Sequence, residues 1–275
     1  MLRERSGVLR YLRDMSRVPE SLAGTGRSDR LDALRGAAML WMTAFHFAFD
    51  LNQFHLIARQ NFYADPFWTG QRLAIVTLFL GCAGVAQALA RRPGAAAVPA
   101  TRFWRRWAQV AGCAVLVSLG SAWMFPRSWI SFGVLHAVAA MLLILHVVER
   151  TGGVASGERP GAWRGWLAAG AVALLLPQVV AHPLFDSRWT GWVGLVTHKP
   201  VTEDFVPLLP WFGVFAWGYA AGLWLTRHRP QWLAGALARP LQPLARLGRW
   251  SLSYYMVHQP VLIGALLVLT RITVR

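Results

Sequence analysis

Residues 31–55 read LDALRGAAMLWMTAFHFAFDLNQFH, and this stretch decides what kind of fold the chain adopts. From Ala37 to Leu51 nearly every residue is apolar, as in a helix surrounded by lipid. His46 and Asp50 interrupt the run four residues apart, so a helix places them on one face. Ionisable groups inside a membrane are costly and usually face a bundle interior or a water-filled cavity. The stretch therefore predicts a membrane helix with one polar face.

The rest of the chain repeats this apolar character. Of its 275 residues, 55% are hydrophobic and only 15% are charged, which exceeds the apolar content of an ordinary soluble domain. A membrane span needs about 20 predominantly apolar residues. We therefore predict an all-α transmembrane bundle of about seven spans (28–275) that follows a basic tail (1–27). The expected spans are residues 34–54, 71–90, 104–124, 131–149, 163–181, 207–226 and 250–270.

The net charge of +16 is distributed unevenly between the connections of these spans. If the N-terminus is cytoplasmic, most arginines fall in the tail and the inner connections, whereas the outer connections hold Arg59, Arg127, Arg188 and Lys199. This is a positive-inside distribution, although Arg271 and Arg275 would lie outside. It predicts a multi-pass protein of the inner (plasma) membrane with a cytoplasmic N-terminus. We attribute the basic charge to topology and lipid contact, and expect no nucleic-acid partner.

Two smaller signals concern processing and metals. The first twenty residues lack an apolar core, so we expect no cleavable signal peptide. Cys82 and Cys113 both fall inside expected spans, and their spacing suggests neither a disulfide nor a metal site. We therefore expect no metal cofactor.

His46 and Asp50 have two interpretations. A carboxylate one turn from an imidazole can hold its tautomer and raise its basicity, as a general base requires. Alternatively, the pair joins helices through hydrogen bonds. Arg35 lies eleven residues before His46, about 16 Å along a helix and near the inner end of the span. We favour a functional role for the pair.

Polar residues in later spans extend the same question. His136, in the outer part of the fourth span, fits a site or a packing role equally well. His258 lies near the middle of the seventh span, where Tyr254 and Pro260 suggest a polar, kinked helix that lines a cavity. Asp204, at the outer boundary of the sixth span, is as consistent with a helix cap as with a site. In the sixth span, Gly218 and Gly222 form a GxxxG pattern, which usually serves helix packing.

Six stretches then carry a resemblance to a known family. They are RLDALRGAAMLWMTAFHFAFDLN, FLGCAGVAQALARR, RFWRRWAQVAG, ISFGVLHAVAAMLLIL, PLLPWFGVFAWGYAAG and LGRWSLSYYMVHQPVL. In this order they resemble bacterial membrane proteins related to the catalytic domain of heparan-alpha-glucosaminide N-acetyltransferase. The resemblance covers about residues 28–270.

The resemblance implies a transmembrane acyltransferase. Acetyl-CoA, as the acyl donor, would enter from the cytoplasmic side, and the acetyl group would reach a sugar amine or hydroxyl on the other side. The expected partners are acyl-CoA, an envelope glycan or other small acceptor, and membrane lipids; a homo-oligomer is also allowed. The lysosomal branch has an amide at the position of His46 and its catalytic histidine in the following outer segment, roughly where His55 lies. The base is therefore His46 or His55, and we favour His46 because Asp50 can orient it.

The remaining residues receive roles on chemical grounds. The imidazole either deprotonates the acceptor or carries the acetyl group itself. We expect the catalytic residues to come from a set of four histidines and one aspartate, and the donor phosphates to be bound by inner arginines together with a tyrosine. These sets are His46, Asp50, His55, His136 and His258 for catalysis, and Arg35, Arg102, Arg105, Arg106 and Tyr254 for the donor.

Two rival functions remain open at this point. A proton-coupled transporter or lipid-handling protein would also use histidine, aspartate and a proline-broken helix inside the membrane. A structural subunit would use the same polar residues only to hold helices together.

Overall fold

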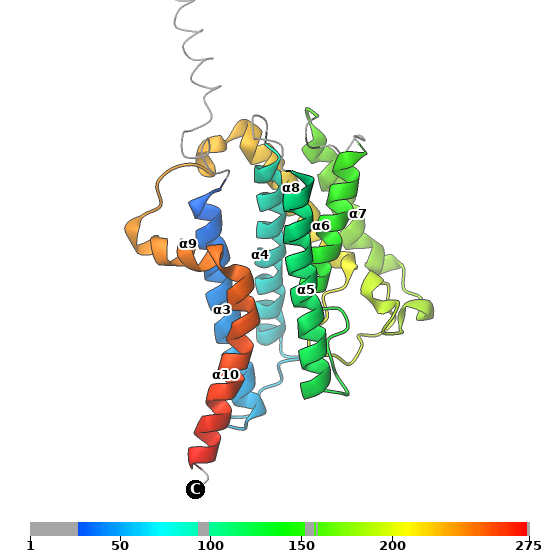
Figure 1. Ribbon diagram of the computed structural model, residues 1–275. Helices are drawn as coiled ribbons and strands as arrows, with labels where there is room; N and C mark the ends of the chain where they lie inside the picture. Colours follow the sequence, from blue (N-terminus) through cyan, green and yellow to red (C-terminus); the bar gives the residue numbers. More distant parts are fainter. Residues whose placement is uncertain (1–26, 93–98, 152–156, 158, 274–275) are drawn as a thin grey trace, which may run out of the picture.

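The computed structural model describes residues 27–92, 99–151, 157 and 159–273, and within these residues the fold consists of eight α-helices and no sheet (Figure 1). The all-α class is therefore confirmed. Apart from Arg27, the basic tail lies outside the described residues. The helices are α3 (Asp29–Gln53), α4 (Pro66–Ala90), α5 (Ala100–Met124), α6 (Val134–Arg150), α7 (Ala162–Val179), α8 (Leu208–His228), α9 (Gln242–Arg249) and α10 (Ser251–Thr273). Short 3-10 turns occupy Pro183–Phe185, Gly191–Val193, Pro230–Trp232 and Arg239–Leu241.

Helices cover all seven segments that the sequence predicted as spans, with ends that differ by a few residues. Four of them, α4, α5, α8 and α10, are long and apolar enough to cross a membrane. The additional helix, α9, falls in a connection where no helix was expected. Its sequence QPLARLGR is short and polar, so it carries no signal for a span.

Glycines set the closest helix contacts in the bundle. Helix α8 packs along α4 on one side and along α7 on the other. On α4, a Cβ at Gly84 would lie 2.2 Å from the carbonyl oxygen of Phe215. A Cβ at Gly218 would lie 2.3 Å from the carbonyl oxygen of Gly81, and Gly222 packs against Ala88. The predicted packing role of the GxxxG pattern is confirmed.

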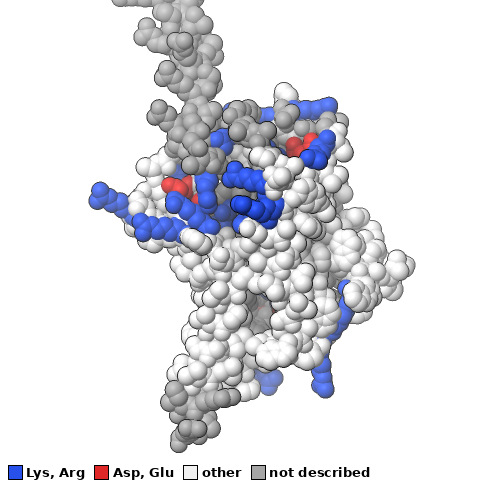
Figure 2. Space-filling view, viewed as in Figure 1, with Lys and Arg blue, Asp and Glu red and all other residues white. Residues whose placement is uncertain are grey.

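The two ends of the bundle differ in charge. Helix α3 begins at the upper end of Figure 1, and α10 ends at the lower end. Lys and Arg side chains gather at the upper end, whereas the middle of the same face is almost free of charge (Figure 2). We call the upper end, where α3 and α5 begin and α8 ends, the basic end.

At the opposite end, two loops pair and organise the start of α6. Phe132 and Phe205 form an isolated parallel bridge. The backbone N–H of Val134 donates to Asp204 Oδ2 at 2.9 Å. Asp204 is therefore a helix cap, but for α6 rather than for the helix that follows it in sequence. The cap joins two loops that are 70 residues apart.

Candidate active site

Two histidines meet between the first and last long helices. His46 Nδ1 on α3 lies 2.8 Å from His258 Nε2 on α10. His258 is 7% exposed. Its other nitrogen, Nδ1, lies 2.7 Å from the backbone carbonyl of Tyr255. The sequence singled out both histidines but did not predict that they bond to each other.

The bonding pattern determines where the protons sit. A carbonyl only accepts, so His258 Nδ1 carries a proton and donates it to Tyr255. In neutral His258 the other nitrogen, Nε2, then has a lone pair and accepts from His46 Nδ1–H. Neutral His46 consequently keeps its own Nε2 lone pair, for which no partner occurs among the described residues. This tautomer is the one that a general base or a nucleophile needs.

The histidine pair belongs to a polar seam, which we define as three contacts between α3 and α10. Towards the basic end, Thr43 donates to the carbonyl of Met39, so the hydroxyl of Tyr254 donates to Thr43 Oγ1 at 2.7 Å. The histidine contact comes next. Beyond it, Gln259 Nε2 donates to both carboxylate oxygens of Asp50, at 2.9 and 3.1 Å.

Asp50 therefore has a different partner from the one expected. The carboxylate is 4% exposed and bonds to Gln259 on the neighbouring helix, while His46 is oriented by His258. The geometry gives Asp50 a joining role in the seam. Tyr254 likewise joins α3 to α10 and is absent from the lining of the pocket described below.

His136 uses both of its ring nitrogens in the structure of α6. Nδ1 accepts from the backbone N–H of Gly133 at 3.2 Å, which caps the helix. Ser118 donates to the carbonyl of Ile130, so its oxygen accepts from His136 Nε2, 3.1 Å away. Neither nitrogen is left for a substrate. Of the two roles that the sequence allowed, the geometry favours packing.

His55 is placed at the end of α3, and its side chain is exposed. It adopts a left-handed conformation with φ of 58°. Its N–H donates to the carbonyl of Asn52, and the next N–H, of Leu56, donates to the carbonyl of Leu51. This pattern is a Schellman motif, which commonly ends a helix and usually places glycine at the His55 position. The conformation of His55 thus has a purely structural explanation.

A basic pocket opens at the end of the bundle where α3 begins. It encloses about 290 Å³, slightly below the usual range for a ligand site, so it suits part of a large ligand. Arg35 and Arg106, both predicted to bind the donor, line it together with Arg27. Arg102 and Arg105 do not line it, and both are exposed. Ser251, the first residue of α10, also forms part of the wall.

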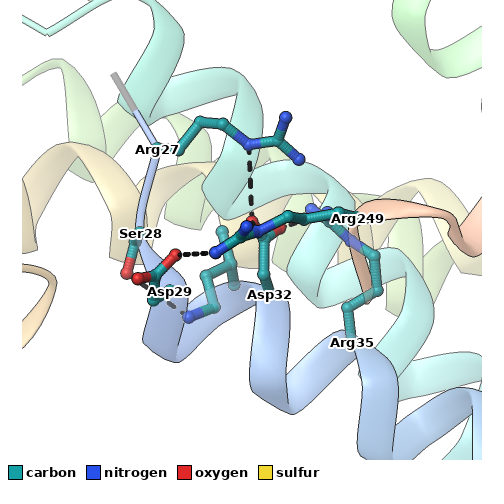
Figure 3. Close-up of polar contacts among 7 residues, drawn as sticks. Arg27, Ser28, Asp29, Asp32, Arg35 and Arg249 are labelled. Atoms are coloured by element: carbon teal, nitrogen blue, oxygen red, sulfur yellow. Dashed lines mark hydrogen bonds and ion pairs between the residues drawn. The ribbon is translucent and has the colours of Figure 1, made fainter. Parts of the chain in front are cut away.

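A single carboxylate organises the arginines beside this pocket (Figure 3). Arg35 NH1 lies 2.9 Å from Asp32 Oδ1, Arg27 Nε lies 3.4 Å from Oδ2, and Arg249 Nε lies 3.9 Å from Oδ2. Arg249 also pairs with Asp29 at 2.8 Å. The sequence interpretation missed Asp32, and it attributed Arg27 and Arg249, like the other arginines of the tail and inner connections, to topology and lipid contact. The one available signal was the spacing of Asp32 and Arg35, which places the two on one helix face.

A second, smaller set of charges lies at the opposite end of the bundle. Lys199 Nζ lies 5.6 Å from the ring centre of Tyr63. Burial lowers the pKa of Lys199, and the nearby charge of Arg72 lowers it further, while Asp204 opposes the shift. For Asp204 itself, burial raises the pKa of the carboxyl. Arg72, near the beginning of α4, was not among the predicted site residues.

Comparison with known proteins identifies the family of the chain. A family model described as "Heparan-alpha-glucosaminide N-acetyltransferase, catalytic" matches residues 27–260. Comparisons with curated proteins and with solved structures give no significant match. The matched region begins at Arg27, contains the arginines beside the basic pocket and includes both members of the histidine pair. The chain therefore belongs to the heparan-alpha-glucosaminide N-acetyltransferase catalytic domain family.

Proposed function

We propose that the chain moves an acetyl group from acetyl-CoA, bound at the basic end, to an amine or hydroxyl acceptor that enters from the opposite end. Membership of the family and the four apolar helices indicate a membrane acetyltransferase. The observation that carries the catalytic assignment is the bonding of His46, which leaves Nε2 unprotonated within the polar seam between α3 and α10.

The donor is expected to lie along α3 and α10 from the pocket towards the histidines. Arginine guanidinium groups bind phosphates through several donors at once, so Arg35, Arg27 and Arg106 would hold the nucleotide part of coenzyme A. Ser251 lines the pocket, and His258 lies seven residues further along α10, about 10 Å along the helix. The pantetheine arm would cover this distance and bring the thioester to His46.

The chemical step then needs one base at His46. As the acceptor oxygen or nitrogen forms its bond to the acetyl carbon, its proton moves to His46 Nε2. The carbon–sulfur bond breaks, and His46 returns the proton to the coenzyme A thiolate. If His46 attacks the thioester itself, the carbon–sulfur bond breaks, coenzyme A leaves as the thiolate, and the acetyl group rests on Nε2. The acceptor then attacks this acetyl group, the bond to Nε2 breaks, and the acceptor's proton passes to the thiolate.

We further propose that all seven long helices cross the membrane, with the N-terminus in the cytoplasm. The gathering of arginines at one end supports this orientation, because basic residues are retained on the cytoplasmic side. The pocket then opens towards the compartment that contains acetyl-CoA, and the acceptor is an envelope sugar or another external molecule.

The test uses purified protein in lipid nanodiscs with radiolabelled acetyl-CoA and a panel of amino sugars and glycans. Binding of acetyl-CoA and transfer to at least one acceptor are expected, and a single turnover without acceptor shows whether label stays on the protein. Absence of acetyl-CoA binding overturns the proposal.

The polar seam also suits a proton-coupled transporter, which is the main alternative. Uptake driven by a proton gradient in proteoliposomes, lost in His46→Ala and unaccompanied by acetyl transfer, favours that function instead.

A further inference from the structure

The position of Asp32 raises a question that the proposed reaction does not answer. Its side chain is only 5% exposed, and it lines a pocket whose other charged residues are arginines. If this pocket receives phosphates, a buried carboxylate in its wall repels the ligand. A carboxylate in that position therefore needs a compensating role.

The contacts of Asp32 indicate what that role is. The three guanidinium groups near it come from different segments: Arg27 precedes α3, Arg35 lies on α3, and Arg249 ends α9. Without a central anion, these like charges would repel one another and turn towards solvent. Asp32 thus holds together charges that the fold brings in from separate parts of the chain (Figure 3).

The hydrogen bonds to Asp32 do not use all the donors of the arginines around it. Oδ2 has no hydrogen-bond partner among the described residues, because Arg27 and Arg249 approach it without bonding geometry. Each guanidinium has five N–H donors, so an arginine held by one carboxylate oxygen keeps donors for a phosphate. Three arginines around one carboxylate leave a net positive charge, of which Asp29 offsets a part on the exposed side of Arg249.

We propose that Asp32 is a positioning residue for the donor: it holds Arg27 and Arg35 in the wall of the basic pocket and Arg249 beside that wall, so that these arginines bind the phosphates of coenzyme A. This inference rests on the proposed function and adds the residue that arranges its donor site. Asp32 lies at the start of α3, and His46 is about 20 Å further along the helix, so Asp32 takes no part in the chemical step.

The direction in which Asp32→Asn changes the affinity for the donor distinguishes the positioning role from electrostatic repulsion alone. Asp32→Asn removes a negative charge next to the phosphates, so electrostatics alone predicts tighter donor binding. Loss of arginine positioning predicts weaker binding, by about tenfold or more, because hydrogen bonds to charged groups are lost. Asp32→Glu restores the charge and is expected to recover part of the affinity.

The experiment measures the Kd of acetyl-CoA by calorimetry in nanodiscs, and KM and kcat in the transfer assay. For Asp32→Asn we expect a raised Kd and KM with kcat within about twofold, since the chemical step is remote. Asp65→Asn, at the N-cap of α4, is the matched control, because asparagine caps a helix as well as aspartate does. If Asp32→Asn does not fold, the double variant Arg27→Gln/Arg249→Gln removes two of the arginines that Asp32 holds and is expected to raise the Kd; an unchanged Kd would overturn the role of this cluster.

The outcomes distinguish this inference from the proposed function. Wild-type protein that does not bind acetyl-CoA overturns the function itself. Wild-type binding together with equal or tighter binding by Asp32→Asn overturns only the role of Asp32. A lowered kcat with an unchanged KM also contradicts it, because that result places Asp32 in catalysis or in general stability.

Discussion

At the scale of single residues, the hydrogen bonds of the ring nitrogens distinguish the histidines from one another. His136 bonds through one nitrogen to a backbone N–H and through the other to Ser118, whereas His46 bonds through only one, to His258, among the residues that the structure describes. A histidine with both nitrogens engaged cannot take a proton from a substrate without breaking a bond. The free Nε2 therefore makes His46 the better candidate for the base.

The choice between His46 and His55 can be tested by one pair of variants. His46→Ala removes the base and should lower kcat by about 10²-fold or more. His55→Gly should retain activity and stability, because glycine is the preferred residue at this left-handed helix end. Initial rates of acetyl transfer check both variants; loss of activity in His55→Gly with His46→Ala active would reverse the assignment.

The pH dependence of Asp204 gives a second test at this scale. Burial raises its pKa above the ordinary value of 3.8, so the folded chain is most favoured with Asp204 protonated, and this stability is lost as pH rises. Asp204→Asn keeps an acceptor for Val134 without a charge, so above pH 3.8 it should match or exceed the wild type. Asp204→Ala loses the cap of α6 and should cost about 0.5–2 kcal/mol.

Thermal unfolding of detergent-solubilised protein between pH 4 and 8 measures both effects. The wild-type melting temperature should fall relative to that of Asp204→Asn as the pH rises. An opposite slope would show that the ionised carboxylate stabilises the fold.

Residue identity alone could predict which side chains are unusual, but not which of them meet. His46, Asp50 and His258 stand out because they are polar within apolar runs. Their pairing depends on how α10 is rotated against α3, and the bonds show Asp50 opposite Gln259 rather than beside His46. Sequence spacing reports neighbours on one helix and contains no measure of rotation between helices.

At the scale of the elements, α3 and α9 form a joint that depends on two glycines. A Cβ at Gly36 would lie 1.9 Å from the carbonyl oxygen of Leu244, and one at Gly248 would lie 1.8 Å from that of Asp32. Backbone atoms cannot move aside as side chains can. The joint also places Arg249, the residue after Gly248, beside Asp32.

Gly248→Ala should therefore separate α9 from α3. We expect a loss of about 1–3 kcal/mol from overpacking, together with weaker acetyl-CoA binding through displacement of Arg249. Gly264→Ala on α10 is the matched control, because nothing lies within 4 Å of a Cβ there. The melting temperature and the Kd of acetyl-CoA are measured for both variants. Equal values for the two variants would contradict the proposed dependence of the α3–α9 joint on Gly248.

The helices themselves were largely predictable, and α9 was not. Long apolar runs are set by the thickness of the membrane, so their length appears directly in the sequence. Helix α9 is held against α3 by close backbone contacts at the two glycines. Such tertiary contacts require no apolar run in the sequence of α9. The contribution of Arg249 to the cluster around Asp32 was missed for the same reason.

At the scale of the whole molecule, the basic end should face the cytoplasm. Single cysteines at Ser128 and at Ser187 lie on the opposite end, and one at Arg239 lies in the connection between α8 and α9. In a background without Cys82 and Cys113, a membrane-impermeant thiol reagent should label the first two positions in intact cells. Position 239 should react only after permeabilisation, and the reverse pattern would invert the orientation.

The contact between His46 and His258 joins residues that are 212 positions apart, at the two ends of the matched region. At a synthesis rate of 5–20 residues per second, roughly 10–40 s separate the two histidines on the ribosome. During that time Arg27 and Arg35 already exist, but His46 has no orienting partner. In the proposed mechanism, a nascent or truncated chain would therefore meet acetyl-CoA without a complete catalytic pair, and activity would begin only after the last helix is made.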